Sequence, residues 1–210
     1  MGQAFLDHVT EATNALNADV VLFTGDLIDL SIHELPRAIS TARRWRGRHG
    51  MFMIEGNHDL IDDPQGYWNG IRASGLNFLR NSTFTFDHDG TPVQLLGTAW
   101  AHSPALIAQD VRSVVARRDA RAFPILMAHH PHSFDPAADA GLPLTLSGHT
   151  HGGQLAIKPG LSVGNLMFKY VSGIYQKPDA KLLVSNGTGN WFPLRVNVPA
   201  EIIEIELVSA

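Results

Sequence analysis

The sequence predicts an α/β protein, because buried strand patterns alternate with amphipathic helix patterns along its 210 residues. Near-continuous apolar runs, such as 19–24 and 51–54, are typical of strands in a sheet that is covered on both faces. Stretches with helical spacing separate these runs, and the first covers Ala4 to Leu16 with Phe5 and Val9 on one face. No linker or low-complexity tract divides the chain, so residues 1–210 are expected to form a single domain.

The remaining elements follow from the same periodicities, taken in chain order. Further helices are predicted over 34–45, 67–74 and 105–117, with Pro36 tolerated in the first turn of the earliest. Strands are predicted at apolar or alternating runs, namely 19–24, 51–54, 77–79, 83–86, 93–97, 124–127, 142–146, 182–185 and 202–207. The Gly-rich stretch that ends near 178 is expected to be mostly loop.

Composition excludes several kinds of site. The chain has no cysteine, so it can form neither a disulfide nor a thiolate metal site, and any metal must bind nitrogen and oxygen ligands. A net charge of −4 without a large cluster of Lys and Arg gives no footprint for nucleic acid. No apolar run approaches the roughly 20 residues of a membrane span, and no signal-peptide pattern opens the sequence.

Polar turns follow four of the predicted buried strands. These turns are Gly25-Asp26, Gly56-Asn57-His58-Asp59, His129-His130-Pro131-His132 and Gly148-His149-Thr150-His151. Groups placed beyond the carboxyl ends of strands in an α/β sheet converge on one crevice, so we expect these side chains to meet. Carboxylate, amide oxygen and imidazole together suit Mn, Fe, Co or Zn. The sequence therefore predicts a transition-metal site.

The order of these turns resembles the motif series of the calcineurin-like metallophosphoesterases, which runs G-D, G-N-H-[D/E], H, G-H-x-H. The later stretches 185–189 and 198–202 resemble a bacterial branch of membrane-associated phosphohydrolases that act on lipid-linked or nucleotide-sugar pyrophosphates. The resemblance extends from the first predicted helix to the C-terminus. It implies a four-layer αββα sandwich and metal-dependent hydrolysis of phosphoric esters: phosphodiesters, phosphomonoesters or the pyrophosphate of a lipid-linked substrate.

The resemblance also implies a role for each motif residue. Asp26 would bridge the ions of a binuclear centre. Asn57, His129 and His149 would complete the shell of one ion, and His151 would bind the other. His58 would lie near the scissile phosphate as a catalytic imidazole paired with Asp59.

Other polar and aromatic residues are weaker candidates. His130 and His102 could line the substrate cleft, although a surface or supporting role is the plainer interpretation of each. Tyr170, Trp191 and Phe192 are expected to pack in the core, and flanking an apolar part of the substrate is the alternative.

The D-x-H motif that opens the family pattern occurs nowhere in the 210 residues, and the adjacent Asp7 and His8 have the wrong spacing to replace it. Three interpretations remain open. The chain starts too late and lacks a first strand; or it is a natural short form that works with one well-held ion, or with a second ion weakly held by Asp26, His151 and water. In the third, it is a remnant that binds metal or phosphate without turnover, or with very weak turnover. If it is active, we expect weak hydrolysis of activated esters such as aryl phosphate diesters.

The same considerations give expectations about partners and location. A missing first strand would expose a sheet edge, and exposed edges invite pairing, so a homodimer or poor solubility is expected. The partner of the active site would be a small phosphoester. The resemblance implies a place in the cytoplasm or at the periphery of the bacterial inner membrane.

Overall fold

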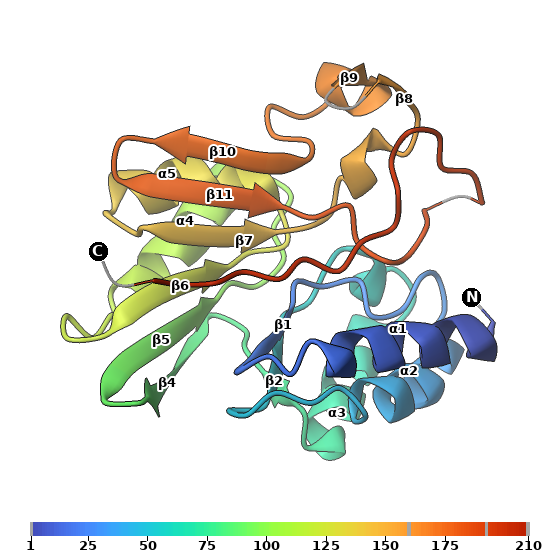
Figure 1. Ribbon diagram of the computed structural model, residues 1–210, viewed down its shortest axis with the longest axis horizontal. Coiled ribbons are helices and arrows are strands. Elements are labelled where there is room, and N and C mark those ends of the chain that lie inside the picture. Colours follow the sequence, from blue (N-terminus) through green and yellow to red (C-terminus); the bar gives the residue numbers. More distant parts are fainter. Residues whose placement is uncertain (1, 159–160, 192, 209–210) are drawn as a thin grey trace.

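The computed structural model describes residues 2–158, 161–191 and 193–208, and in them most strands lie in two sheets (Figure 1). The smaller sheet is parallel, with the order β1 (Val21–Phe23), β2 (Met51–Met53) and β3 (Asn77–Phe78). The larger sheet has the order β10-β11-β7-β6-β5-β4. Its strands in chain order are β4 (Ser82–His88), β5 (Thr91–Gly97), β6 (Phe123–Met127), β7 (Leu144–Ser147), β10 (Gly173–Lys177) and β11 (Ala180–Val184). A small hairpin of β8 (Ala156–Lys158) and β9 (Leu161–Ser162) stands apart from both.

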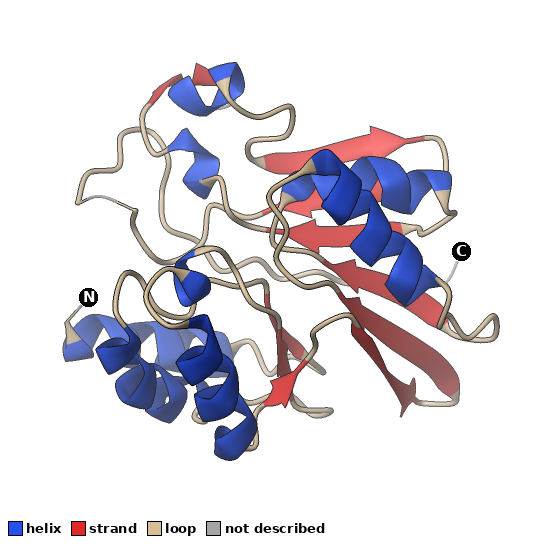
Figure 2. Cartoon of the chain, turned by 180° about the vertical axis from the view of Figure 1, so that it is seen from behind, coloured by secondary structure: helices blue, strands red, loops and turns tan. Residues whose placement is uncertain are grey.

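Helices cover the outer face of each sheet, which gives four layers (Figure 2). On the smaller sheet lie α1 (Gln3–Ala15), α2 (Leu35–Ala42) and α3 (Pro64–Ser74), and on the larger sheet α4 (Pro104–Val115) and α5 (Phe134–Asp139). Short 3₁₀ turns join them, at Ile32–Glu34, His58–Leu60, Pro131–Ser133, His151–Gly153 and Val163–Leu166. The predicted αββα sandwich is confirmed.

Burial on both faces explains the apolar strands. Along β6, Ile125 and Met127 pack between the sheets against Phe52 of β2, whereas Leu126 packs on the other side against Val111 of α4. Successive side chains of a strand point to opposite faces, so a strand covered on both faces needs apolar residues throughout. This arrangement brings the carboxyl ends of β1, β2, β6 and β7 to the centre of the molecule.

Three sequence predictions about elements are wrong. The Gly-rich stretch that ends near 178 is more structured than its glycines indicated, because β10 pairs with β11. Helix α5 has no counterpart among the predicted helices. The stretch 202–207 forms no strand within the described residues, and Ile202, Ile205 and Leu207 are 39%, 40% and 51% exposed. Its alternating pattern is suited to a strand, but no neighbouring strand supplies ladder hydrogen bonds.

The late aromatic residues differ from one another. Tyr170 is buried against Phe134, as expected for the core, whereas Trp191 is 65% exposed and Phe192 lies outside the described residues. None of the helices in the described part of the chain is long and apolar enough to cross a bilayer.

Candidate metal centre

Four loops that follow β1, β2, β6 and β7 bring the predicted ligands together. His129 Nε2 lies 3.2 Å from Asp26 Oδ2 and 3.1 Å from Asn57 Oδ1. Asn57 Oδ1 also lies 2.8 Å from His149 Nδ1. Side chains far apart in the chain thus meet at the carboxyl ends of parallel strands, as the strand pattern predicted.

Two glycines make this approach possible. A Cβ on Gly56 would overlap Asp26 Oδ1 and lie 2.7 Å from His129 Cε1. A Cβ on Gly25 would lie 2.6 Å from His129 Nδ1, and Gly25 also has a φ of +102°, which favours glycine. The glycines of the Gly-Asp and Gly-Asn-His motifs therefore provide the space in which carboxylate and imidazole meet.

The ligand residues themselves have unusual backbones. Asp26, His149 and His151 have φ values of 62°, 70° and 50°, in the left-handed region that residues with a side chain rarely adopt. Such conformations persist only where the surroundings impose them, and they concentrate at functional sites. Here they turn the side chains back towards the strand ends.

Hydrogen bonds fix the ring of His129. Its Nδ1 donates to the carbonyl of Thr24 at 2.6 Å, so in the neutral ring Nε2 presents its lone pair towards Asp26 and Asn57. Burial disfavours the charged ring, but the neighbouring Asp26 carboxylate outweighs it and raises the pKa of His129. The same pair acts on the carboxylate: although burial opposes its charge, His129 and the N–H of His58 lower the pKa of Asp26 to about 2.

The other histidines are kept neutral by their surroundings. Burial is the main cause that lowers the pKa of His149 to about 3 and those of His130 and His151 to about 4. Neutral imidazole and ionised carboxylate are the protonation states that bind metal. At neutral pH these three imidazoles therefore need not lose a proton before they bind metal.

His151 gives an independent test of whether a metal fits. Its Nδ1 is buried and has no hydrogen-bond partner among the described residues. Buried polar atoms are nearly always satisfied, and an unpaired imidazole nitrogen is a natural metal ligand. The donor set therefore fits a transition metal. Among the described residues, however, no three His, Asp or Glu side chains are already arranged at metal-binding distances.

The partner of His58 differs from the expectation. His58 Nδ1 lies 2.9 Å from Asp29 Oδ1, and not next to Asp59. Asp59 instead accepts three backbone hydrogen bonds, from Asp26, Ile28 and Gly56 at 2.8–3.0 Å. Burial and the charge of Asp26 raise the pKa of Asp59 to about 7. Asp59 thus fastens the two ligand loops to each other, and Asp29 orients the imidazole.

The sequence carried a signal for Asp29 that the motif series obscured. Asp29 stands three residues after Asp26, so the turn that follows β1 places both acids on the side of the second loop. Adjacency in the chain suggested Asp59, but the 3₁₀ turn over His58–Leu60 points the neighbouring side chains in different directions.

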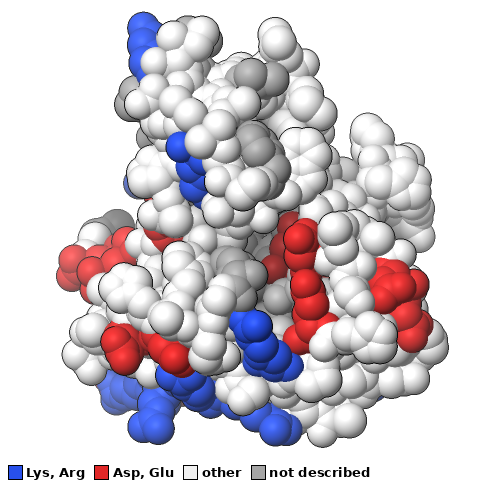
Figure 3. Space-filling model, turned by 90° about the vertical axis from the view of Figure 1, so that its right-hand side faces the viewer, with Lys and Arg blue, Asp and Glu red and all other residues white. Residues whose placement is uncertain are grey.

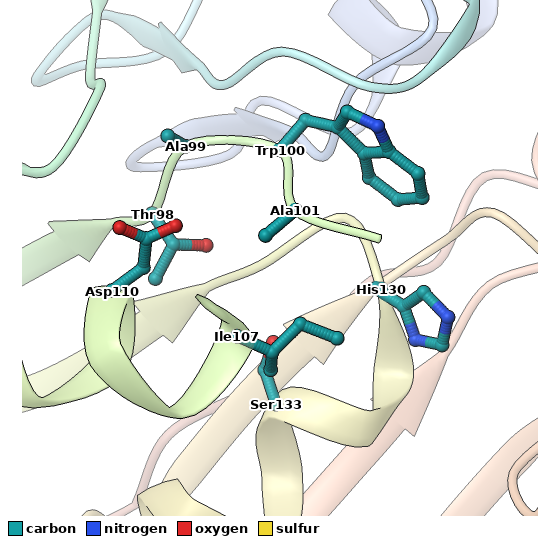
Figure 4. Close-up of a pocket in the computed structure, with 8 residues that line it drawn as sticks. All are labelled: Thr98, Ala99, Trp100, Ala101, Ile107, Asp110, His130 and Ser133. Atoms are coloured by element: carbon teal, nitrogen blue, oxygen red, sulfur yellow. The ribbon is translucent and has the colours of Figure 1, made fainter. Parts of the chain in front are cut away.

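Aromatic rings surround the histidines. His149 lies 5.1 Å from the Trp100 ring, 5.3 Å from Phe168 and 4.8 Å from His130, measured between ring centroids. A hollow of about 10 Å³, enough for roughly one water molecule, lies beside Trp100 and His130 (Figure 4). His130 therefore lies at the cluster. His102 is exposed and has no hydrogen bond or ring contact among the described residues, so the structure does not bring it to the site.

Charge is distributed unevenly over the molecule. On the face in Figure 3, acidic side chains lie in the lower half, whereas the upper lobe that holds β8 and β9 shows some basic side chains and no acidic one. The sequence agrees, because no Asp or Glu occurs between Asp139 and Asp179. No broad basic surface of the kind that binds nucleic acid is seen on this face.

Several curated proteins are similar in sequence to this chain over nearly its whole length. An uncharacterised metallophosphoesterase of Helicobacter pylori is 31% identical over 209 residues, which cover 97% of this chain and 55% of the relative. YkuE of Bacillus subtilis, an uncharacterised metallophosphoesterase, is 30% identical over 93% of this chain and 70% of its own length. A transmembrane protein with a metallophosphoesterase domain from Danio rerio is 29% identical over 100% of this chain and 50% of its own. The chain thus spans about half the length of several curated relatives.

Solved structures share the fold at low sequence identity. The NAD nucleotidase of Haemophilus influenzae superposes with a TM-score of 0.56 at 12% identity, over 86% of this chain and 43% of that one. A 5'-nucleotidase precursor of Thermus thermophilus gives 0.52 at 14% identity, over 88% of this chain and 42% of that one. The model of the calcineurin-like phosphoesterase family matches residues 3–153, which contain every loop of the candidate centre. The chain therefore belongs to the calcineurin-like phosphoesterase family.

Proposed function

We propose that the chain is a metal-dependent hydrolase of phosphoric esters. The observation that carries the proposal is that His129 Nε2 lies within 3.2 Å of both Asp26 and Asn57, although the three residues follow separate strands. The unpartnered nitrogen of His151 supports it, because it adds a further donor with no other use among the described residues.

The donor set suits one ion better than two. Asp26, Asn57, His129 and His149 would hold one Mn, Fe, Co or Zn ion, and Asp26 with His151 would hold a second more weakly. When bound, such ions supply charge stabilisation for the phosphoryl oxygens and lower the pKa of water. With the donors of the described residues alone, we expect weak turnover, best with activated aryl phosphate diesters.

His58 would act on the substrate. Asp29 binds its Nδ1, so in the protonated ring Nε2 is the atom that can donate a hydrogen bond to a phosphoryl oxygen or a proton to the leaving group. The N–H of His58 donates to Asp26 Oδ1 at 2.9 Å, so the same residue holds the carboxylate in place. His130, stacked on Trp100, is proposed to line the substrate cleft.

The decisive experiment compares metal content with turnover of bis(p-nitrophenyl) phosphate in the presence of Mn²⁺. In Asp26→Ala we expect turnover to fall by about 100-fold or more, since an ion contributes several kcal/mol of charge stabilisation. Asp139→Ala removes a carboxylate that is 78% exposed and remote in sequence, and should leave turnover unchanged. Bound metal without any turnover in the wild type would favour a non-catalytic metal- or phosphate-binding remnant, and no uptake of metal would contradict both functions.

We also propose that the lobe around β8 and β9 contacts a lipid surface and that the substrate is lipid-linked. Ile157, Leu166 and Met167 on this lobe are 83%, 89% and 70% exposed. Apolar tips without acidic neighbours suit the interface of a membrane that carries anionic lipids. In sedimentation with phosphatidylglycerol vesicles, Leu166→Glu should reduce binding. Leu30→Glu, a change at a 60% exposed residue away from this lobe in the sequence, should leave vesicle binding unchanged. Loss of binding in both variants, or in neither, would contradict this site.

A further inference from the structure

A buried carboxylate outside the proposed ligand set lies beside the candidate centre. Glu55 follows β2 and directly precedes Gly56 and Asn57, and its side chain is fully buried. It accepts hydrogen bonds from Trp68 Nε1 at 2.6 Å, Arg80 Nε at 3.1 Å and the backbone N–H of Trp100 at 3.0 Å. The three donors come from a helix of the first layer, from the loop after β3 and from the loop after β5.

The third of these bonds reaches the wall of the centre. The indole of Trp100 lies 5.1 Å from the ring of His149, 5.5 Å from His129 and 5.8 Å from His130, between centroids. Figure 4 shows the indole and the imidazole of His130 projecting to the same side, away from Asp110. The position of Trp100 therefore constrains two of the proposed ligand rings.

The loop that carries Trp100 depends on few backbone bonds. Thr98 N–H donates to the carbonyl of Met127, and Ala99 N–H donates to Asn81 Oδ1 at 2.9 Å. Both acceptors lie outside the segment that carries Asn57. Of the three successive N–H groups, the Trp100 N–H alone is held by that segment, through Glu55. The carboxylate thus connects the loop of Asn57 to the ring that packs on His129 and His149.

A simple packing role does not account for the choice of glutamate. Burying a carboxylate is unfavourable unless it is paired and hydrogen-bonded, and an apolar residue would fill the same space without that requirement. Glu55 gains its compensation from Arg80, whose guanidinium also stacks on the Trp68 ring at 4.3 Å. A buried, hydrogen-bonded glutamate is explained if its carboxylate has to hold the backbone N–H of Trp100 in a fixed position.

We propose that Glu55 is a positioning residue, which holds Trp100 against His129 and His149 so that their rings keep the orientation needed for metal. The consequence for turnover rests on the proposed function, but the positioning itself does not. Glu55→Gln replaces one carboxylate oxygen by an NH₂ group, which cannot accept a hydrogen bond. The oxygen that remains is expected to stay with Trp68 Nε1, whose bond of 2.6 Å is the shortest of the three, so the Trp100 N–H should lose its acceptor.

The test follows the histidine rings in the metal-free protein, by NMR of histidine-labelled samples. Resonances that Trp100→Phe displaces identify the rings next to the indole. We expect Glu55→Gln to move the same resonances towards their Trp100→Phe positions. Trp68→Phe removes another donor to the same carboxylate but leaves the Trp100 bond, and should leave these resonances in place.

Two functional measurements accompany the spectra. Co²⁺ affinity should weaken by about 10-fold in Glu55→Gln, the usual size for a group that orients ligands from outside the shell. With an aryl phosphate diester, kcat should fall while KM stays within about twofold. If Glu55→Gln does not fold, Glu55→Asp keeps the charge, shortens the reach by one methylene, and is measured in the same way.

The outcomes separate the two proposals. Shifted resonances in a chain without turnover would contradict the proposed function and still support the role of Glu55. A folded Glu55→Gln protein with wild-type resonances and wild-type Co²⁺ affinity would overturn the positioning role. A Trp68→Phe protein whose resonances move as far as those of Glu55→Gln would overturn it as well.

Discussion

At the scale of single residues, two aspartates that look alike in the sequence have different partners. Asp29 lies 2.9 Å from His58 Nδ1, whereas Asp59, next to His58 in the chain, accepts hydrogen bonds from three backbone N–H groups. A carboxylate on Nδ1 sets the tautomer of an imidazole, and a carboxylate on backbone groups sets the shape of loops. Substitution of Asp29 should therefore affect turnover, whereas substitution of Asp59 should affect the stability of the fold.

Asp29→Asn should lower the turnover of an aryl phosphate diester by roughly 10-fold or more and leave the fold intact. The physical reason is that an amide stabilises the protonated or correctly oriented imidazole less well than a carboxylate does. Steady-state kinetics with Mn²⁺, alongside a thermal melt, measure both quantities. An unchanged kcat would show that Asp29 does not assist His58.

Asp59→Ala should instead destabilise the metal-free protein, by about 2–5 kcal/mol, because three backbone donors lose their acceptor in a buried site. Urea denaturation of the metal-free chain gives this number directly. If Asp59→Ala instead kept full stability and lost only turnover, the result would favour the pairing of Asp59 with His58 that the sequence suggested.

At the scale of elements, the strand pattern predicted where the ligand loops meet, but it did not predict the individual side-chain contacts. The Gly-Asp and Gly-Asn-His turns could be placed at one site because parallel strands carry their carboxyl ends to the same edge. The partners of Glu55 could not be predicted, since Trp68, Arg80 and Trp100 lie 13, 25 and 45 residues away from it. Likewise the alternation of 202–207 is typical of a strand, but a strand also requires a neighbour that the pattern does not describe.

One acidic residue of helix α5, Asp135, ties the helix to β10 and to the segment that precedes it. Asp135 lies 2.9 Å from Lys169 Nζ and 3.0 Å from Lys177 Nζ, and it accepts from the Tyr170 hydroxyl at 2.9 Å. Burial works against the charged form, but the hydrogen bonds from these three groups outweigh it, so the pKa of Asp135 is lowered.

A lowered carboxyl pKa stabilises the folded chain above the unfolded pKa, and this contribution is lost as the pH falls through the folded value. We therefore expect Asp135→Asn to reduce stability by about 0.5–1 kcal/mol at pH 7, allowing for solvent screening. The difference from wild type should vanish in strong acid. Denaturant curves at both pH values measure it. Asp139→Asn serves as the control, because among the described residues this carboxylate meets only Lys177, at 3.5 Å, and an effect of equal size there would contradict a specific role for Asp135.

At the scale of the whole molecule, the smaller sheet has a free edge along β1 in the described part of the chain. Val21 N–H donates to Gly50 and the carbonyl of Phe23 accepts from Ile54, so the N–H of Leu22 points away from β2. Free edges invite pairing with a second strand. We predict a homodimer through this edge.

Light scattering should give twice the mass of one chain, and hydrogen exchange at the Leu22 amide should slow as the protein concentration rises. A monomer at every concentration would contradict the prediction. A dimer whose Leu22 amide exchanges equally fast at all concentrations would place the interface elsewhere.

The left-handed backbones of Asp26, His149 and His151 have a consequence for how this sequence can change. Each such conformation costs on the order of 1 kcal/mol or more. This cost is considerable, because the free energy of unfolding of a domain is typically only about 5–15 kcal/mol. Glycine relieves that cost at all three positions. A library selected only for heat resistance should therefore accumulate glycine at 26, 149 and 151. Its most stable members should be proteins that no longer carry the metal-binding side chains at these positions.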